Sequence, residues 1–444
     1  MLINNLYSNK ITKNIIFSLF IFFLISIFYG PSLINFFHLI TAFFSFYFFF
    51  YKNKFFKFNL NFTVSIISIF LLYLIFNSFF LVDDSSILFK SFFYFRFILT
   101  SYIISKFLEV IENRQILLSL CYLIISILLC FDIFYQANTG YDIFGFKAGI
   151  CVYPGGEQFF DPKNCERFSG FFGEEYIAGS FLVTYGLFFL YFYYKFSNKN
   201  KINLFFTIIS LIIILSGIFI SGERNAFLGL ILILFVNFIF NKSLRKYLFY
   251  LVILFSLVLT FNINKFDHIK YRYIEWPLNN ISKNEGNIAK KFIQTQWGVH
   301  YITAYEIFLD NKLFGSGFKS FRKVCQDTNY SSDNLNQKYK IDLKGLSGCS
   351  THPHNIYFEL ISEVGIIGLV FFILMIFSII FIPLIKNLKK IQNYDEIIMV
   401  LSIIMTFLFP LRPTGSITST VYATNLFFFI GFYLYLVNKH KDNE

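Results

Sequence analysis

The residues best suited to acid–base chemistry are two histidines, His352 and His354, which flank Pro353 just before a long apolar run. An imidazole exchanges protons near neutral pH, so a histidine at the mouth of a membrane span is a candidate general base. Helical spacing predicts that His354 shares a face with Gly365 and Gly368, where a neighbouring helix could approach closely. The same spacing predicts that His352 points elsewhere.

Two other interpretations of the histidines stay open. Both side chains could do no more than hydrogen-bond the loop backbone. They could also bind a metal ion, but histidines two residues apart point away from each other on a helix, and spacing fixes no further ligand. We therefore predict that His354 is the catalytic base, and we predict no metal and no cofactor.

Arginines form the second group of candidate residues. Arg224 lies in a short hairpin, Ser-Gly-Glu-Arg, between two apolar runs. A guanidinium donates paired hydrogen bonds to a phosphate, so Arg224 is a candidate ligand for an anionic headgroup, although it could instead satisfy helix-terminal carbonyls. Arg167 and Arg412 are placed similarly, and the three could surround one headgroup. Arg96 lies near the middle of a predicted span, where structural pairing and substrate contact are equally open.

The composition is that of a membrane protein. The chain has 444 residues, of which 56% are hydrophobic and 14% charged, whereas a soluble domain carries roughly a quarter charged residues. The net charge of +12 is spread in short clusters between apolar runs. Such clusters are typical of topology determinants rather than of a nucleic-acid-binding surface.

Hydropathy predicts an all-α polytopic protein of about twelve spans, because each apolar run is long enough to cross ~30 Å of hydrocarbon. The runs lie near residues 14–29, 33–51, 62–82, 86–108, 115–135, 170–194, 203–220, 225–240, 247–262, 355–383, 396–410 and 416–437. Basic clusters follow alternate spans, which by the positive-inside rule predicts an inner-membrane protein with both termini in the cytoplasm.

The same alternation predicts three regions. Residues 1–262 carry helices one to nine with a periplasmic loop at 136–169, residues 263–354 form a long periplasmic loop, and residues 355–444 carry helices ten to twelve.

Four cysteines fall in the two predicted periplasmic loops. Cys151 and Cys165 share the first loop, and Cys325 and Cys349 share the second. An oxidising periplasm would allow one disulfide within each loop, although free thiols are the alternative.

These stretches resemble the O-antigen ligase and polymerase family, membrane glycosyltransferases that use undecaprenyl-diphosphate-linked glycans outside the cytoplasmic membrane. The family's His-Asn, nine residues and then Gly-x-x-Gly are matched by His354, Asn355, Gly365 and Gly368. Ser221-Gly-Glu-Arg224 resembles its Ser-x-x-Arg. Further matches are Arg167–Gly170, the Gly-x-Gly segment within Leu313–Arg322, and Pro413–Ser416. The likeness runs from about residue 90 to about residue 420.

The resemblance implies transfer of a glycan from undecaprenyl diphosphate to an acceptor hydroxyl, with inversion and without nucleotide sugar, metal or cofactor. It implies that His354 is the base, that Arg224 stabilises the diphosphate, and that Asn355 binds substrate. Many members carry an arginine before the long loop's amphipathic helix, where this chain reads Gln294-Thr-Gln-Trp-Gly-Val-His300. The second phosphate ligand is therefore open, with His300, Arg322 and Arg272 as candidates in that order.

Two acceptors fit the resemblance. Lipid A core would make the enzyme a ligase, and a second carrier-linked glycan would make it a polymerase of O-antigen or exopolysaccharide. We favour the ligase, because the His-Asn motif lies at the start of a late span. A lipid-linked glycan flippase is a third alternative, but transporters tend to have inverted repeats and broken midplane helices.

Overall fold

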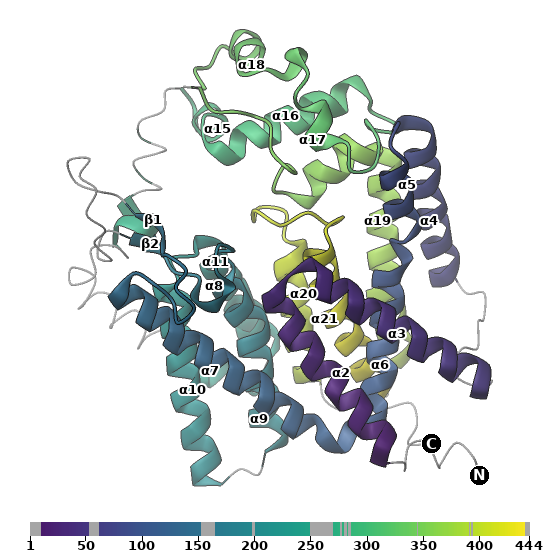
Figure 1. Cartoon of the computed structure of the whole chain (residues 1–444), viewed down its shortest axis with the longest axis vertical. Helices are drawn as coiled ribbons and strands as arrows, with labels where there is room; N and C mark the ends of the chain where they lie inside the picture. The colour runs from purple at the N-terminus through teal and green to yellow at the C-terminus, as the bar shows by residue number, and fades with distance from the viewer. Residues whose placement is uncertain are drawn as a thin grey trace. The chain divides into compact units, whose positions relative to one another are not determined.

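The computed structural model describes residues 10–52, 62–151, 165–197, 200–248, 270–275, 286–343, 345–389 and 394–439, together with residues 278, 282 and 391. Over these residues the chain is helical apart from one short pair of strands (Figure 1). Helices dominate because a backbone in lipid must satisfy its hydrogen bonds within each segment.

Seven of the described helices are long and apolar enough to cross a membrane, and two more apolar helices, Pro31–Phe44 and Arg224–Phe240, are shorter. These segments coincide with predicted spans, which confirms a polytopic membrane protein. The predicted spans at 170–194 and 396–410 are not among these nine helices, and the predicted span at 247–262 lies outside the described residues. The total of twelve spans therefore remains a prediction.

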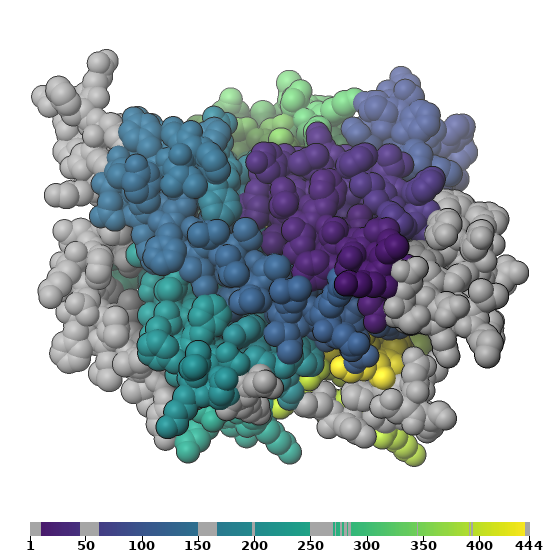
Figure 2. Space-filling view, turned by 60° about the horizontal axis from the view of Figure 1, so that its bottom comes forward, coloured from purple at the N-terminus to yellow at the C-terminus, as the bar shows by residue number. Residues whose placement is uncertain are grey.

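The chain forms two compact units, and the first comprises Met1–Phe37, Phe107–Leu278 and Asn393–Thr406. Helix α7 packs against α9 and α10, and Figure 2 shows this part of the surface in blue and teal. The described helices of this unit are α2 (Lys10–Tyr29), α7 (Gln115–Thr139), α8 (Ala178–Phe181), α9 (Leu187–Phe196), α10 (Lys201–Ile220), α11 (Arg224–Phe240) and most of α20 (Tyr394–Leu408).

The strand pair lies in the first predicted loop and was not expected from the sequence. Strand β1 (Gly149–Cys151) runs antiparallel to β2 (Cys165–Arg167), with Cys151 directly opposite Cys165. A disulfide between these two residues stays a prediction.

The second unit comprises His38–Lys106, Asn279–Gln392 and Phe407–Glu444. Its long helix α19 packs against α4, α16 and α21 (Figure 1). The described helices are most of α3 (Pro31–Lys52), α4 (Phe62–Leu81), α5 (Ser85–Phe92), most of α6 (Phe95–Val110), α15 (Ile288–Ile293), α16 (Gln296–Asp310), α17 (Phe321–Val324), α18 (Ser332–Tyr339), α19 (Ile356–Asn387) and α21 (Thr420–Asn438).

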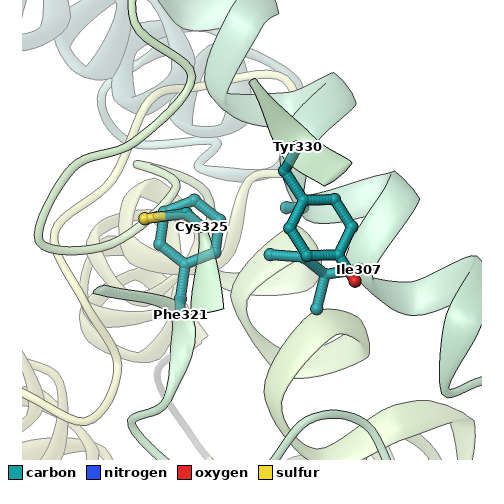
Figure 3. Packing of buried hydrophobic residues seen from close by; sticks show 5 residues of the cluster. Ile307, Phe321, Cys325 and Tyr330 are labelled. Atoms are coloured by element: carbon teal, nitrogen blue, oxygen red, sulfur yellow. The ribbon is translucent and has the colours of Figure 1, made fainter. Parts of the chain in front are cut away.

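The described part of the long loop is folded rather than extended. The side chains of Thr295 and Ser331 cap α16 and α18 by accepting backbone N–H groups, as N-cap residues do. Ile307, Phe321, Cys325 and Tyr330 form a buried apolar cluster, with Phe321 and Cys325 on one side and Ile307 and Tyr330 on the other (Figure 3). The structure joins Cys325 to Cys349 by a disulfide, which fixes the segment before His352 to this cluster.

Candidate functional site

The backbone at His354 differs from the helical geometry expected from spacing. Helix α19 begins at Ile356 with Asn355 as its N-cap, so His354 precedes the helix. Its φ of 56° lies in the left-handed region, which is uncommon for a residue with a side chain. The prediction that His354 shares a helical face with Gly365 and Gly368 is therefore wrong. The left-handed turn instead directs its ring toward the folded loop.

Three histidine rings and one indole gather at this turn. The ring centroid of His354 lies 4.1 Å from that of His352, 5.5 Å from that of His300 and 4.7 Å from that of Trp297. The expectation that His352 points away from His354 is thus also wrong, because the left-handed residue folds the two rings together. Among the described residues, no three metal-ligating side chains are grouped so as to hold a metal ion.

Burial keeps these imidazoles uncharged. Desolvation, reinforced by His352 and His300, lowers the pKa of His354 to about 3, and desolvation lowers the pKa of His352 to about 4. The expectation that His354 titrates near neutral pH therefore disagrees with the burial of its ring. A neutral imidazole has a lone pair that can accept a proton, so low pKa values leave His354 in the form that a general base requires.

The hydrogen bonds of the three rings differ. His300 Nδ1 donates to the Gly348 carbonyl at 3.0 Å, and its Nε2 lies 3.0 Å from Gln296 Nε2. His352 Nδ1 lies 3.0 Å from Thr351 Oγ1. No residue in the described ranges hydrogen-bonds the ring of His354, and neither of its nitrogens is a buried atom lacking a partner. The Nε2 of His352 also has no hydrogen-bond partner among the described residues, but that atom is buried. The nitrogens of His354 are therefore the ones that can meet a substrate hydroxyl.

Asn355 holds the turn in place. Its Oδ1 accepts the backbone N–H groups of Tyr357 and Phe358, while its Nδ2 donates to the Pro410 carbonyl at 2.7 Å. One residue earlier, the His354 carbonyl accepts the Thr414 N–H at 2.8 Å. The fold thus uses the Asn355 side chain for positioning, and substrate contact by this residue stays a prediction.

Two buried glutamates of α19 were missed by the sequence analysis. Glu359 accepts hydrogen bonds from Ser416 Oγ at 2.5 Å, from the Ile417 N–H at 3.0 Å and from Thr418 Oγ1 at 3.1 Å. One turn later, Glu363 accepts the backbone N–H groups of residues 319 and 321. Each carboxylate therefore anchors a loop that flanks the histidine cluster. Two glutamates four residues apart in an apolar run were the available signal.

The glycines of α19 contact a loop rather than only a helix. Gly365 has a φ of 67°, which breaks the helical geometry, and a Cβ there would lie 2.2 Å from the Leu313 carbonyl oxygen. Gly315 approaches the other way, since its Cβ would lie 2.4 Å from the Glu363 carbonyl carbon. Gly368 faces Tyr73 of α4, which is the kind of helix contact that was expected. The Gly315-Ser-Gly317 segment therefore packs directly against the bend of α19 at Gly365.

The first unit gathers three arginines around the hairpin that ends at Arg224. Arg224 opens α11, and Arg272 Nε donates to the Gly222 carbonyl at 3.1 Å. Arg167 donates to the Tyr176 carbonyl at 2.9 Å, and its Nε is buried without a hydrogen-bond partner in the described ranges. Burial raises the pKa of Tyr273, while Arg272, Arg224 and Arg167 act in the opposite direction, so all three lie within electrostatic range of it.

Arg272, a candidate second ligand, lies with Arg224 and Arg167. Arg412 belongs to the second unit, and its place beside Arg224 and Arg167 stays a prediction. A carboxylate also lies within the cluster, because Glu223 acts on the pKa of Arg167 and accepts the Ser180 N–H at 2.8 Å. Burial lowers the pKa of Arg167, and a phosphate beside it would offset that cost.

The remaining candidates lie in the second unit. Arg412 is buried, and Arg322 is exposed within electrostatic range of His352. Arg96 donates to Thr420 Oγ1 at 3.2 Å and lies over the Phe97 ring. Thr420 is the first residue of α21. Arg96 lies within the apolar segment Ser85–Val110, and its depth in the membrane stays a prediction.

Comparison with known proteins places these residues in a family. Residues 209–373 match the family model described as O-antigen ligase. The chain carries an O-antigen ligase domain. This match confirms the resemblance that the His-Asn motif indicated. The matched segment includes the second part of α10, α11, the folded loop and the first half of α19, and therefore both Arg224 and His354. No curated protein matches the chain.

Proposed function

We propose that this chain transfers a glycan from undecaprenyl diphosphate to an acceptor hydroxyl at the periplasmic face of the bacterial inner membrane. One observation carries the proposal: within the O-antigen ligase domain, His354 presents an uncharged ring that no described residue hydrogen-bonds. A base with an open lone pair is what activation of a hydroxyl needs.

The proposed reaction is a single displacement. The acceptor oxygen attacks the anomeric carbon while His354 takes the hydroxyl proton, and the bond between that carbon and the diphosphate oxygen breaks with inversion. The diphosphate leaves with the electron pair, and the imidazolium later gives its proton to water. Negative charge on the diphosphate would favour the protonated ring during the step, although burial lowers its pKa in the free protein.

The hairpin of the first unit supports a second role. Arg224, Arg167 and Arg272 gather positive charge at one place, and the buried Nε of Arg167 has an unused donor. We propose that Arg224 stabilises the departing diphosphate with help from these two neighbours, because guanidinium groups donate paired hydrogen bonds to phosphate oxygens.

For the acceptor we propose lipid A core, which makes the enzyme a ligase; a polymerase that extends carrier-linked glycan is the second candidate. The test is the lipopolysaccharide profile of a deletion strain complemented with wild type or with His354→Ala at matched protein level. Loss of all long chains with carrier-linked polymer accumulating means ligase, and core carrying one repeat means polymerase. Wild-type profiles from His354→Ala would refute the catalytic assignment.

A further inference from the structure

Lys319 has a backbone conformation that its side chain makes unfavourable. It follows the Gly315-Ser-Gly317 segment, in which both glycines have positive φ. Lys319 itself has a φ of 58°, a region that glycine or asparagine occupies more readily. A residue that keeps such a conformation despite its side chain is a candidate for function.

Glu363 imposes this conformation. Its Oε2 accepts the Lys319 N–H at 2.8 Å, and its Oε1 accepts the Phe321 N–H at 3.2 Å. The carbonyl of the same glutamate accepts the Gly317 N–H at 2.8 Å. Glu363 thus holds three backbone N–H groups of this loop. The backbone from which the Lys319 side chain extends is therefore fixed.

Lys319 is half-buried, and no described carboxylate lies within ion-pair distance of its ammonium group. Within the described part of the chain, its Nζ has no hydrogen bond or ion pair. The nearby carboxylates are already engaged, Glu363 by backbone N–H groups and Glu359 by Ser416 to Thr418. Burial lowers the pKa of Lys319, the cations Lys90 and Arg322 lower it further, and the carboxylates of Glu363 and Glu359 oppose that shift. A desolvated cation that no carboxylate contacts directly is stabilised by an incoming anion.

Arg322 adds a second cation on the histidine side. It lies within electrostatic range of Lys319 and also of His352, whose ring contacts that of His354. Arg322 and His352 therefore lie between Lys319 and the proposed base His354, and all four residues belong to the second unit.

We propose that Lys319, supported by Arg322, binds a phosphate group of the substrate. The inference rests on the proposed function, and it supplies the second phosphate ligand that the sequence left open. His300 is less suited to that role, because the Gly348 carbonyl and Gln296 occupy both of its nitrogens. The phosphate belongs either to the carrier diphosphate or to a phosphorylated sugar of the acceptor.

Amine labelling tests binding without using activity. The purified full-length protein is labelled with an amine-reactive reagent at constant ionic strength, and modification of Lys319 is mapped by mass spectrometry, with exposed Lys312 as the internal control. The probes are inorganic pyrophosphate, undecaprenyl diphosphate, and core oligosaccharide before and after phosphatase treatment. We expect at least ~10-fold protection of Lys319 and none of Lys312, as one charge-assisted hydrogen bond provides.

The protecting probe identifies the source of the phosphate. Protection by the two diphosphates means the carrier, and protection only by phosphorylated oligosaccharide means the acceptor. Equal labelling of Lys319 with and without every probe would overturn the proposal.

Variants provide the second test. Lys319→Gly removes the ammonium and suits the positive φ, so it should fold at least as well as wild type, while Lys312→Gln is the matched control. We expect the KM for the phosphate-bearing substrate to rise by ~10-fold or more in Lys319→Gly. An unchanged KM would overturn the proposal. His354→Ala should abolish transfer but keep the protection of Lys319, so failure of the proposed reaction is distinguishable from failure of this site.

Discussion

Replacing Asn355 with alanine should loosen the start of α19 and slow transfer while leaving substrate affinity nearly unchanged. The substitution removes the acceptor for two backbone N–H groups and the donor to the Pro410 carbonyl. Loss of an N-cap costs ~1 kcal/mol, and loss of one further hydrogen bond costs about as much again. We therefore expect a destabilisation of about 2 kcal/mol.

Two comparisons separate these contributions. Asn355→Asp keeps the capping oxygen, but it replaces the donor to Pro410 by a buried acceptor that faces the same carbonyl, so it should cost more than the ~1 kcal/mol of one lost hydrogen bond. Ser331→Ala removes the cap of α18, which makes a single capping hydrogen bond, and should also cost ~1 kcal/mol.

The assay is thermal unfolding of the purified protein in detergent, with kcat and KM measured separately. We expect kcat to fall, because the cap adjoins the left-handed turn at His354. If Asn355→Ala melts with wild-type stability and its KM rises instead, Asn355 contacts substrate and the positioning argument is refuted.

Five further predictions follow, two on the buried histidines and one each on the arginine hairpin, the disulfide and the topology. Because burial lowers the pKa of His354 to about 3, kcat/KM should stay level from about pH 7 to about pH 5, and a decline with an apparent pKa near ~6.5 would contradict this. Stability should instead fall below about pH 6.5, since the unfolded chain takes up protons that the buried rings exclude; melting curves against pH test this. Arg224→Lys keeps the charge but loses the paired hydrogen bonds, so initial rates should fall ~10-fold or more; unchanged rates in Arg224→Ala would exclude it from the site. Cys325→Ser should lower stability by ~3 kcal/mol on the chain-entropy estimate for its short loop, and mass mapping that found free thiols at Cys325 and Cys349 would contradict the bridge. A single cysteine at Ser332 should react with an impermeant reagent from outside the cell, whereas reaction only after lysis would reverse the topology.

The spans could be predicted because hydropathy is local. An apolar run satisfies the hydrogen bonds of its own backbone and can therefore be recognised without its partners. Most of the described spans begin and end within a few residues of the predicted limits, but the span predicted at 170–194 becomes helical only at Ala178. The folded loop was not foreseen, because its core forms between residues far apart, such as Ile307 and Tyr330.

The histidine cluster shows why the site was only partly predictable. The residue types were recognisable, but the left-handed turn at His354 depends on contacts with the segment at Pro410 to Thr414, over fifty residues later in the chain. Spacing rules assume a continuous helix, and they therefore separated two rings that the turn brings together.

The glycine motifs of the sequence are better understood as one feature than as two. In an unbroken helix the N–H groups of Ile366 and Ile367 would donate to the carbonyls of Ser362 and Glu363. Here they donate to Lys312 and Leu313 at 3.0 and 3.4 Å, and the freed carbonyls accept the N–H groups of Ser316 and Gly317, each at 2.8 Å. The loop backbone is thus inserted into the hydrogen-bond ladder of α19, which requires glycine on both sides of the contact because either Cβ would collide with backbone. A helix that exchanges its own bonds for those of a loop fixes the position of that loop, and with it the cations that follow at Lys319 and Arg322.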